Sequence, residues 1–462
     1  MDLTNTDVAL VAMPPGYSAI GWADGRPIQP AEDGVGRSQS GWSAAWARTI
    51  RGLNAFRGRL AALSRPLAVP AFRRLWAAQL VSEVGDWSAR LVLSLLVYGR
   101  TGSPAVTALV TTASLVPWLG PGQLLTSASE RWPRRTVMVT ADLVRAAAFT
   151  LAALPLPVGL LLAVVFCAGL ATPPFEAARA ALRPEVIPET LLPSAVALSS
   201  ITQDLTVAVG YATGGALAAV LGGPTALLVN AASFAASGVL LAGLPPATAP
   251  RAGPASGALG RGWRALQRDP LIVRAVLLVT AAMLTATSLT AVAAPLVLRV
   301  LAAGPATAGA LVALAAIVSI VATAAIPADT NPVRLLRYAA AYALAGGLVT
   351  VGCFAAIGLG VTGPTKLAVL AFAATGLLFA VIAPANVVVS PRLPAGLRAS
   401  ALSLLMGALV ATEAAGAAVT GLAASAVGLL PVCSALGVPA AAAGAYALLA
   451  LPADKPASLL PD

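Results

Sequence analysis

The stretch LWAAQLVSEVGDWSARLVLSLLVY, residues 75–98, decides the fold of this chain because it is long and predominantly apolar. A helix that rises ~1.5 Å per residue needs about 20 such residues to cross the ~30 Å hydrocarbon core of a bilayer. Soluble domains have about a quarter of their residues charged. Only 10% of these 462 residues are charged and 58% are hydrophobic, so the sequence predicts an all-α membrane protein.

Similar apolar runs recur along the chain, without the alternation that lipid-facing strands of a β-barrel show. We predict twelve transmembrane helices, at residues 75–99, 105–127, 136–155, 158–178, 194–220, 224–244, 271–298, 306–326, 335–358, 366–390, 400–427 and 430–451. Arginine gathers in every second connection, whereas the opposite connections contain only Arg100, Arg299 and Lys366. Because positive charge marks the cytoplasmic side, both termini are predicted to be cytoplasmic. This topology accounts for the net charge of +11, and no nucleic-acid partner is expected.

Composition divides the chain into five predicted parts. They are a cytoplasmic N-terminal extension (1–70), a six-helix half (71–244), a cytoplasmic linker (245–270), a second six-helix half (271–451) and a cytoplasmic tail (452–462). The extension begins with a Gly-, Pro- and Ser-rich segment that is predicted to be disordered. Residues 41–64 can place their apolar side chains on one helical face, which favours an amphipathic helix on the membrane surface; a wholly disordered extension is the alternative.

The two halves are predicted to be pseudo-symmetric repeats. SERWPRR (129–135) aligns with ADTNPVR (328–334) at an offset of 199 residues, and Gly215 aligns with Gly421 at an offset of 206. Parallel repeats of this kind occur in secondary transporters, in which one half moves against the other around a central site.

Several function classes are excluded by what the sequence lacks. It has no histidine, which excludes His-based metal sites and Ser-His-Asp hydrolysis. No glycine-rich phosphate loop with a lysine is present, so ATP hydrolysis is not expected. The three cysteines fall in apolar segments without paired spacing and are expected to be buried side chains. We therefore expect neither an enzyme nor a bound metal or cofactor.

Five stretches together resemble the major facilitator superfamily, and within it the drug-efflux branch that includes macrolide and enterobactin exporters. They are FRRLWAAQLVSEVGDWSARLVLSLLVY (72–98), SERWPRRTVMVTADLVRA (129–146), PPFEAARAALRPEVIP (173–188), GRGWRALQRDP (260–270) and LPAGLRASALSL (393–404). The resemblance extends from residue 70 to about residue 450. It implies a monomeric, multi-pass transporter of the bacterial cytoplasmic membrane.

The resemblance also implies a cytoplasmic gating loop formed by Glu130, Arg131, Arg134 and Arg135. Such a cluster could hold a latch of charge-assisted hydrogen bonds that biases the inward-open and outward-open states. The alternative is that the arginines only set the topology. Thr126 stands where the family signature opens with glycine.

The fifth predicted span contains GYATGG (210–215), in which Gly210, Gly214 and Gly215 are expected to permit close helix packing. Tyr211 occupies the place where the family has proline, so a proline-dependent kink is in doubt.

Glu83, Asp86 and Arg90 lie near the middle of the first predicted span, and helical spacing puts them on one face. Charge on a lipid-facing surface at this depth is costly, so this face should line the bundle interior or an aqueous cavity. Asp86 is expected to pair with Arg90, four residues later. Glu83 is then the acid without a partner, which could carry a proton during transport, stay protonated as a structural hydrogen-bond donor, or contact the substrate.

Two more acids, Asp204 and Glu413, lie deep in the fifth and eleventh predicted spans. In the repeat alignment, Glu413 is equivalent to a residue less than one helical turn from Asp204. We therefore expect the two acids to face a central cavity from opposite halves. On the third span, Asp142 and Arg145 are three residues apart and are expected to form a helix staple.

Together these features favour a proton-coupled antiporter that exports lipophilic drug-like compounds or secondary metabolites by alternating access. Its partners would be a small-molecule substrate, protons and the lipid bilayer. A cationic substrate is favoured because interior acids outnumber the single cavity arginine. One alternative is a proton-independent facilitator or importer of a small solute. Another is a non-transporting membrane scaffold or sensor that acts through the N-terminal extension.

Overall fold

The computed structural model describes residues 63–244, 266–327, 331–361, 363–393 and 395–451, together with a short antiparallel pair of strands, β1 (Trp22–Ala23) and β2 (Arg26–Pro27). The chain divides into two units, Met1–Ala62 and Leu63–Asp462, and every described helix belongs to the second. The predicted helix at 41–64, the linker 245–270 and the tail 452–462 lie almost entirely outside the described residues.

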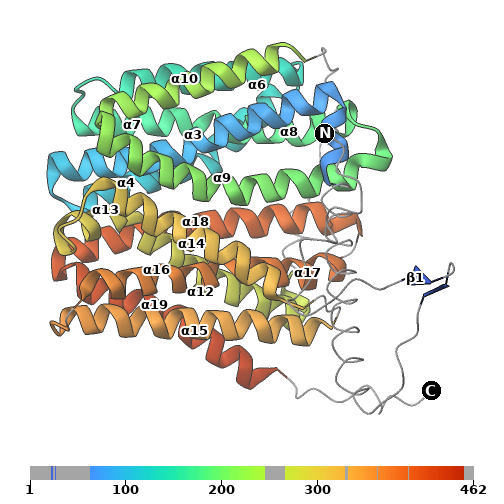
Figure 1. Ribbon diagram of the computed structural model, residues 1–462. Coiled ribbons are helices and arrows are strands. Elements are labelled where there is room, and N and C mark those ends of the chain that lie inside the picture. The colour runs from blue at the N-terminus through green and yellow to red at the C-terminus, as the bar shows by residue number, and fades with distance from the viewer. Residues whose placement is uncertain are drawn as a thin grey trace. The chain divides into compact units, whose positions relative to one another are not determined.

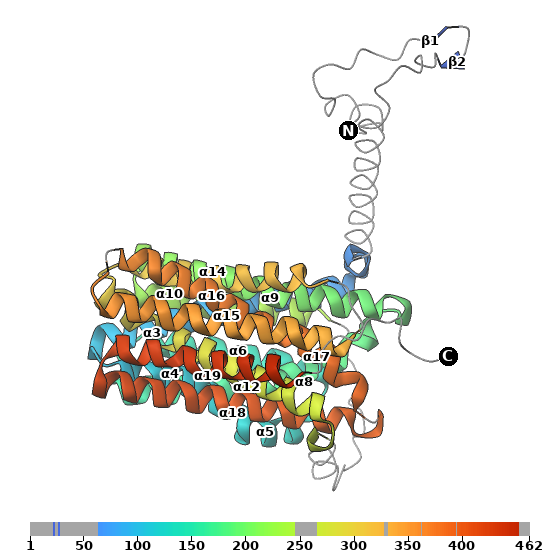
Figure 2. The ribbon, with the colours of Figure 1, turned by 90° about the horizontal axis from the view of Figure 1, so that it is seen from below.

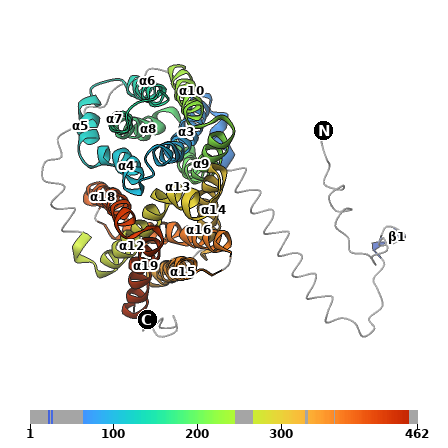
Figure 3. The same ribbon diagram turned by 90° about the vertical axis from the view of Figure 1, so that its left-hand side faces the viewer.

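The helices of the second unit form two groups that lie beside one another (Figures 1 and 3). The first group contains η1 (Arg65–Ala68), α3 (Pro70–Thr101), α4 (Pro104–Leu115), η2 (Val116–Leu119), α5 (Pro121–Ser129), α6 (Arg134–Ala152), α7 (Val158–Leu170), α8 (Thr172–Val186), η3 (Glu189–Leu191), α9 (Leu192–Leu221) and α10 (Gly223–Ala242). The second contains α12 (Pro270–Ala291), α13 (Ala293–Pro295), η4 (Leu296–Val300), α14 (Pro305–Ala325), α15 (Pro332–Gly358), α16 (Pro364–Ala380), α17 (Ile382–Arg392), α18 (Ala395–Val427) and α19 (Leu429–Ala450).

Helices cover most of each of the twelve predicted spans. Within the described ranges, nine helical segments are long and apolar enough to cross a membrane, or ten if the bent pair of α4–η2 and α5 counts as one span. Helices α3 and α6, which carry charged side chains, are not among these segments. That α3 and α6 also cross the membrane therefore stays a prediction.

Proline determines where many of these helices begin and where two of them break. The first residue of α3, α4, α5, α12, α14, α15 and α16 is proline. Its missing N–H is not needed in a first turn, and its ring fixes a helical φ. The breaks between α7 and α8 and between α16 and α17 precede Pro173 and Pro384, because a proline inside a helix cannot donate to the preceding turn.

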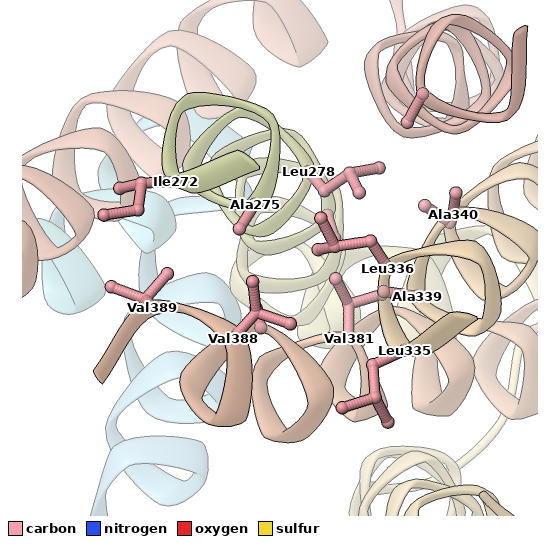
Figure 4. Close-up of a cluster of buried hydrophobic side chains, with 14 of the residues drawn as sticks. Ile272, Ala275, Leu278, Leu335, Leu336, Ala339, Ala340, Val381, Val388 and Val389 are labelled. Carbon is pink, nitrogen blue, oxygen red and sulfur yellow. The ribbon is translucent and has the colours of Figure 1, made fainter. Parts of the chain in front are cut away.

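Buried aliphatic side chains fill each group separately and also join the two. In the second group, Ile272 and Leu278 of α12 pack in a cluster with side chains of α15 and α17 (Figure 4). Another cluster fills the first group between α3, α6, α7 and α10. A further cluster crosses between the groups and includes Leu91 of α3, Tyr211 of α9 and Leu289 of α12.

Two close helix contacts, which we call the seams, hold the groups together. In the α9–α14 seam, a Cβ on Gly215 would lie 2.9 Å from Gly309 Cα and 2.8 Å from the Pro305 oxygen. In the α4–α18 seam, a Cβ on Gly421 would lie 3.0 Å from the Pro104 oxygen. At both seams only glycine allows the backbones to approach so closely.

Gly210 and Gly214 allow a similarly close approach of two helices inside the first group. A Cβ on Gly210 would lie 2.9 Å from the Val84 oxygen, and one on Gly214 would lie 2.7 Å from the Ser88 oxygen, both on α3. All three glycines of α9 thus lie at close helix contacts, and Gly215 packs against the other group.

We expect Gly215→Val to lower thermal stability, because its side chain would force α9 and α14 apart. Overpacking of this kind costs on the order of 1–3 kcal/mol. The unfolding temperature of the purified protein in detergent measures the effect. Gly352→Val is the matched control, since no atom lies within 4 Å of its Cβ position. Equal unfolding temperatures for the two variants would show that the seam tolerates a side chain.

Candidate functional site

Two buried arginines organise the charged side chains of the first group. Arg179 of α8 donates from Nη1 to Oε1 of Glu83 and from Nη2 to Oε2 of Glu176, both at 2.5 Å. The Thr206 hydroxyl of α9 donates to the other Glu83 oxygen at 2.9 Å. Only 7% of the Arg179 side chain is exposed. We call Glu83, Glu176, Arg179 and Thr206 the Arg179 network.

Arg145 of α6 forms a second centre of the same kind. Its Nη2 donates to Oδ1 of Asp142 at 2.6 Å, and its Nη1 donates to Oδ2 of Asp86 at 3.1 Å. The guanidinium carbon also lies 4.3 Å and 4.6 Å from the ring centroids of Phe175 and Phe234. Asp142 and Arg145 thus form an ion pair within α6, and Asp86 joins it from α3. We call these three charged residues the Arg145 network.

The two networks repeat one pattern. In each, an arginine pairs with an acid three residues earlier on its own helix and with an acid of α3. Glu83 and Asp86 are themselves three residues apart, so α3 offers them one turn apart to two different helices. Since charge in hydrocarbon is costly, each acid of α3 is stabilised by a cation from a neighbouring helix.

Two predictions about α3 are wrong. Glu83 is not an acid without a partner, because α8 continues the fourth span and brings Arg179 into the bundle. Arg179 follows directly after the fourth predicted span, 158–178, so the span boundaries did not indicate that it lies in the bundle. Asp86 pairs with Arg145 rather than with Arg90, since an i,i+4 pair contributes only about 0.2–0.5 kcal/mol and a buried partner from another helix outweighs it.

Arg90 belongs instead to a cluster where the two groups meet. Its guanidinium carbon lies 4.4 Å from the Trp87 ring centroid, and the Trp87 and Tyr211 rings lie 5.6 Å apart. Glu413 of α18 and the Tyr211 hydroxyl both lie within electrostatic range of Arg90. Glu413 is half-buried and has no ion-pair partner within 4 Å among the described residues. We call these four residues the Arg90 cluster.

Asp204 stands apart from both networks. It is exposed on α9, and it lies within electrostatic range of Glu83. The structure therefore brings Glu83 and Asp86 into ion-pair networks and Arg90 and Glu413 into one cluster, and it leaves Asp204 without an ion pair in the described part of the chain.

A small cavity of about 60 Å³ adjoins the Arg145 network. Its lining includes Asp86, Arg90, Arg145 and Trp118. The Arg145 Nε and one Asp142 oxygen are buried without a hydrogen-bond partner. A polar space of this size can hold water, which would provide the missing hydrogen bonds.

The arginines of the predicted gating loop have other partners than the expected acid, Glu130. Arg134 forms an ion pair with Glu185 at the end of α8 and donates to the Ala181 oxygen at 2.6 Å. Arg135 donates to the Leu244 oxygen at 2.8 Å. Glu130, expected to be the acid of a latch, is exposed and has no ion pair among the described residues. The resemblance implied Glu130 as that acid, whereas α8 places Glu185 beside Arg134.

Sequence reasoning missed the network roles of Glu176, Arg179 and Glu185. The available signal was the spacing of Glu176 and Arg179, which is the same acid-to-arginine spacing as in Asp142 and Arg145. Among the described residues no group of histidine, cysteine, aspartate and glutamate could hold a metal ion.

Comparison with known proteins gives a consistent result. A family model described as transmembrane secretion effector, of the MFS_3 type, matches residues 61–459. The uncharacterized MFS-type transporter YfiS of Bacillus subtilis (strain 168) is 26% identical over 329 residues, which cover 69% of this chain and 78% of that protein.

The solved structures with a similar fold include a nucleoside transporter and a bacterial homolog of a lysosomal transporter. The nucleoside transporter NupG matches with a TM-score of 0.63 at 13% identity, over 82% of this chain and 98% of that one. A bacterial homolog of the human lysosomal transporter Spinster, in an inward-facing and occupied conformation, matches with a TM-score of 0.65 at 15% identity, over 81% and 95%. At these identities the likeness shows the fold alone.

We expect Arg179→Met to destabilise the protein strongly, because Glu83 and Glu176 would be left facing one another without a cation. Removing one partner of a buried ion pair costs about 3–5 kcal/mol. The unfolding temperature in detergent measures this cost. Adding Glu83→Gln to the variant should restore part of it, since one of the two uncompensated charges is then removed.

Arg183→Met is the matched control. Arg183 lies one turn further along α8 and forms no ion pair among the described residues. A loss of stability as large as that of Arg179→Met would show that the networks are not what stabilises α8.

Proposed function

The chain belongs to the transmembrane secretion effector family of major-facilitator-type transporters, and from that premise we propose that it is a proton-coupled antiporter that exports lipophilic compounds. That it is a membrane transporter of the major facilitator type follows from the family. The direction of transport, the coupling to protons and the class of substrate are our proposals, and each is argued below from the described residues.

Alternating access is supported by contacts that recur at nearly constant offsets. Gly210 of α9 packs against Val84 and Ser88 of α3, and Gly416 of α18 packs against Leu284 and Ser288 of α12. The glycines are 206 residues apart.

The residues that these two glycines contact on α3 and α12 are 200 positions apart in the sequence. The two seams add a matching pair, Gly215 against α14 and Gly421 against α4. Equivalent contacts in both groups support two pseudo-symmetric halves that can move about smooth, glycine-lined seams.

The location of the charges supports proton coupling through Glu413, and this is the observation that carries the proposal. The Arg179 and Arg145 networks lie wholly within the first group, so movement between the groups does not require them to break. The attraction between Arg90 and Glu413 crosses between the groups and must change when they move. A carboxyl group whose electrostatic partner moves away is the one that gains most from binding a proton.

The substrate is proposed to be lipophilic with an aromatic or similarly flat part. Trp87 and Tyr211 offer ring faces beside Arg90 and Glu413. The expected preference for a cation loses its basis, because Arg145 and Arg179 neutralise much of the interior acid excess. Either sign of charge could be accepted where Arg90 and Glu413 lie together.

A facilitator of a polar solute is less well supported. It would need many free hydrogen-bond donors in the interior. The hydroxyl groups of Thr287 and Thr290 on α12 donate instead to carbonyl oxygens of their own helix. That of Thr285 donates to the Leu436 oxygen of α19 at 2.7 Å. Hydroxyls bonded in this way are not available to a solute.

The number of spans, the topology, the oligomeric state and the location are proposed from the family and the sequence. We propose that α3 and α6 complete a set of twelve spans, that both termini are cytoplasmic and that the protein acts as a monomer in a bacterial cytoplasmic membrane. The ion pair of Arg134 with Glu185 would act as the cytoplasmic latch in place of the expected contact of Glu130.

The proposal is tested in proteoliposomes with an acidic interior and a trapped pH dye. Lipophilic cations, macrolides and catecholate siderophores are added in turn, and at least one class should release protons. In Glu413→Gln this proton release should fall to the level of empty liposomes, because glutamine cannot exchange a proton. Exchange of labelled for unlabelled compound should persist, since glutamine mimics the protonated acid.

Glu189→Gln is the control, because Glu189 is an exposed acid in η3 outside the networks and the Arg90 cluster. Compound exchange without any proton release in the unmodified protein would favour the facilitator. Proton release that survives in Glu413→Gln would assign the coupling to another acid.

A further inference from the structure

A cavity of the first group lies beside α5 and α6, and no residue of the Arg90 cluster lines it. Its volume is about 480 Å³, within the ~300–1,000 Å³ range of pockets that hold small ligands. It is lined by Leu125, Ala128, Ser129, Arg131, Trp132, Val137, Thr140, Ala141, Val144, Cys167, Leu170, Ala171 and Pro174. We call this cavity the α5–α6 groove.

The groove exists because α5 turns away from the helix before it. The axis of α5 departs by 45° from that of α4–η2. Gly122 lets α5 rest on the start of α8, where a Cβ would lie 2.6 Å from Pro173 Cγ. Figure 3 shows α5 and α6 at the outer edge of the first group.

The sides of the groove are apolar and its rim is not. Leu125 of α5 and Val144 of α6 are 48% and 43% exposed, as is expected of apolar side chains that face lipid. At the rim, Arg131 and Trp132 precede α6, and Trp132 is 52% exposed. An exposed tryptophan beside an arginine is typical of the headgroup level of a membrane.

The Arg131 side chain is already oriented toward the groove. Its Nε donates to the oxygen of Ala128, which itself lines the groove, at 3.0 Å. This bond uses Nε and leaves both terminal nitrogens without a hydrogen bond among the described residues. A guanidinium held in this way matches the bidentate geometry of a phosphate group.

We propose that the α5–α6 groove binds an anionic phospholipid of the cytoplasmic leaflet, with an acyl chain between α5 and α6 and its phosphate on Arg131. The shape, the apolar walls and the single cation at the rim fit the two chemically distinct parts of such a lipid. The site is separate from the proposed transport site, because no residue of the Arg90 cluster or of the two networks lines it.

Cys167 provides a direct probe of occupancy. It lines the groove and is exposed, contrary to the expectation that all three cysteines are buried, whereas Cys353 and Cys433 are 5% and 0% exposed. The rate at which Cys167 of the purified full chain is alkylated in detergent is measured with added phosphatidylglycerol or phosphatidylcholine. Phosphatidylglycerol should slow alkylation at lower concentration than phosphatidylcholine does.

Arg131→Ala should shift the protecting concentration of phosphatidylglycerol upward roughly fivefold, the effect of one basic residue near anionic lipid. Arg73→Ala, which removes an exposed arginine of α3 outside the groove, should leave it unchanged. Native mass spectrometry gives a second measurement. Val144→Trp, which fills the groove, should lose retained phosphatidylglycerol, and Leu348→Trp on the exposed face of α15 should keep it.

Three results would overturn the proposal. Equal protection by both lipids, unaffected by Arg131→Ala, would mean contact with ordinary bilayer lipid only. Absence of protection by either lipid would mean that the groove holds no lipid. Protection by an exported compound but not by phosphatidylglycerol would assign the groove to the substrate.

Discussion

The structure depends on one constraint, which is that a charge buried in a bundle surrounded by hydrocarbon must have a partner of opposite sign. Helix α3 carries Glu83 and Asp86 one turn apart, and each is met by an arginine of a different helix. Because each arginine also holds an acid of its own helix, α3, α6 and α8 are joined by charge as well as by apolar packing. The relative rotation of these helices is thereby fixed, since a turned helix would leave a buried charge unpaired.

The arrangement of these contacts divides the molecule into rigid and movable parts. Both networks lie within the first group, so they stabilise it as one body. The seams between the groups are made of glycine against backbone, as at Gly215 and Gly421, and they include no ion pair. Smooth contacts of this kind can slide at small cost, whereas paired buried charges cannot. The polar attraction that crosses between the groups, from Arg90 to Glu413, is well placed to respond to such movement.

Local sequence rules predicted the site only where both partners lie on one helix. The spacing of Asp142 and Arg145 gave a correct pair, and the same rule applied to Asp86 and Arg90 gave a wrong one. The difference is that Asp86 has a better partner on α6, which no spacing along α3 can reveal. The partner of Arg134 is hidden from the sequence in the same way, since Glu185 comes beside Arg134 only when α8 packs against α6.

The sequence by itself determined that the protein is helical and membrane-embedded, and it indicated glycines that could allow close packing. These properties follow from the length of apolar runs and from the absence of a side chain at glycine, which are local or cumulative along the chain. Only the tertiary structure decided which acid pairs with which arginine, because these pairs join residues 59 and 96 positions apart. It also decided that α5 bends away to open a groove. Both outcomes depend on how neighbouring helices are rotated and packed, and periodicity within one helix carries no information about that.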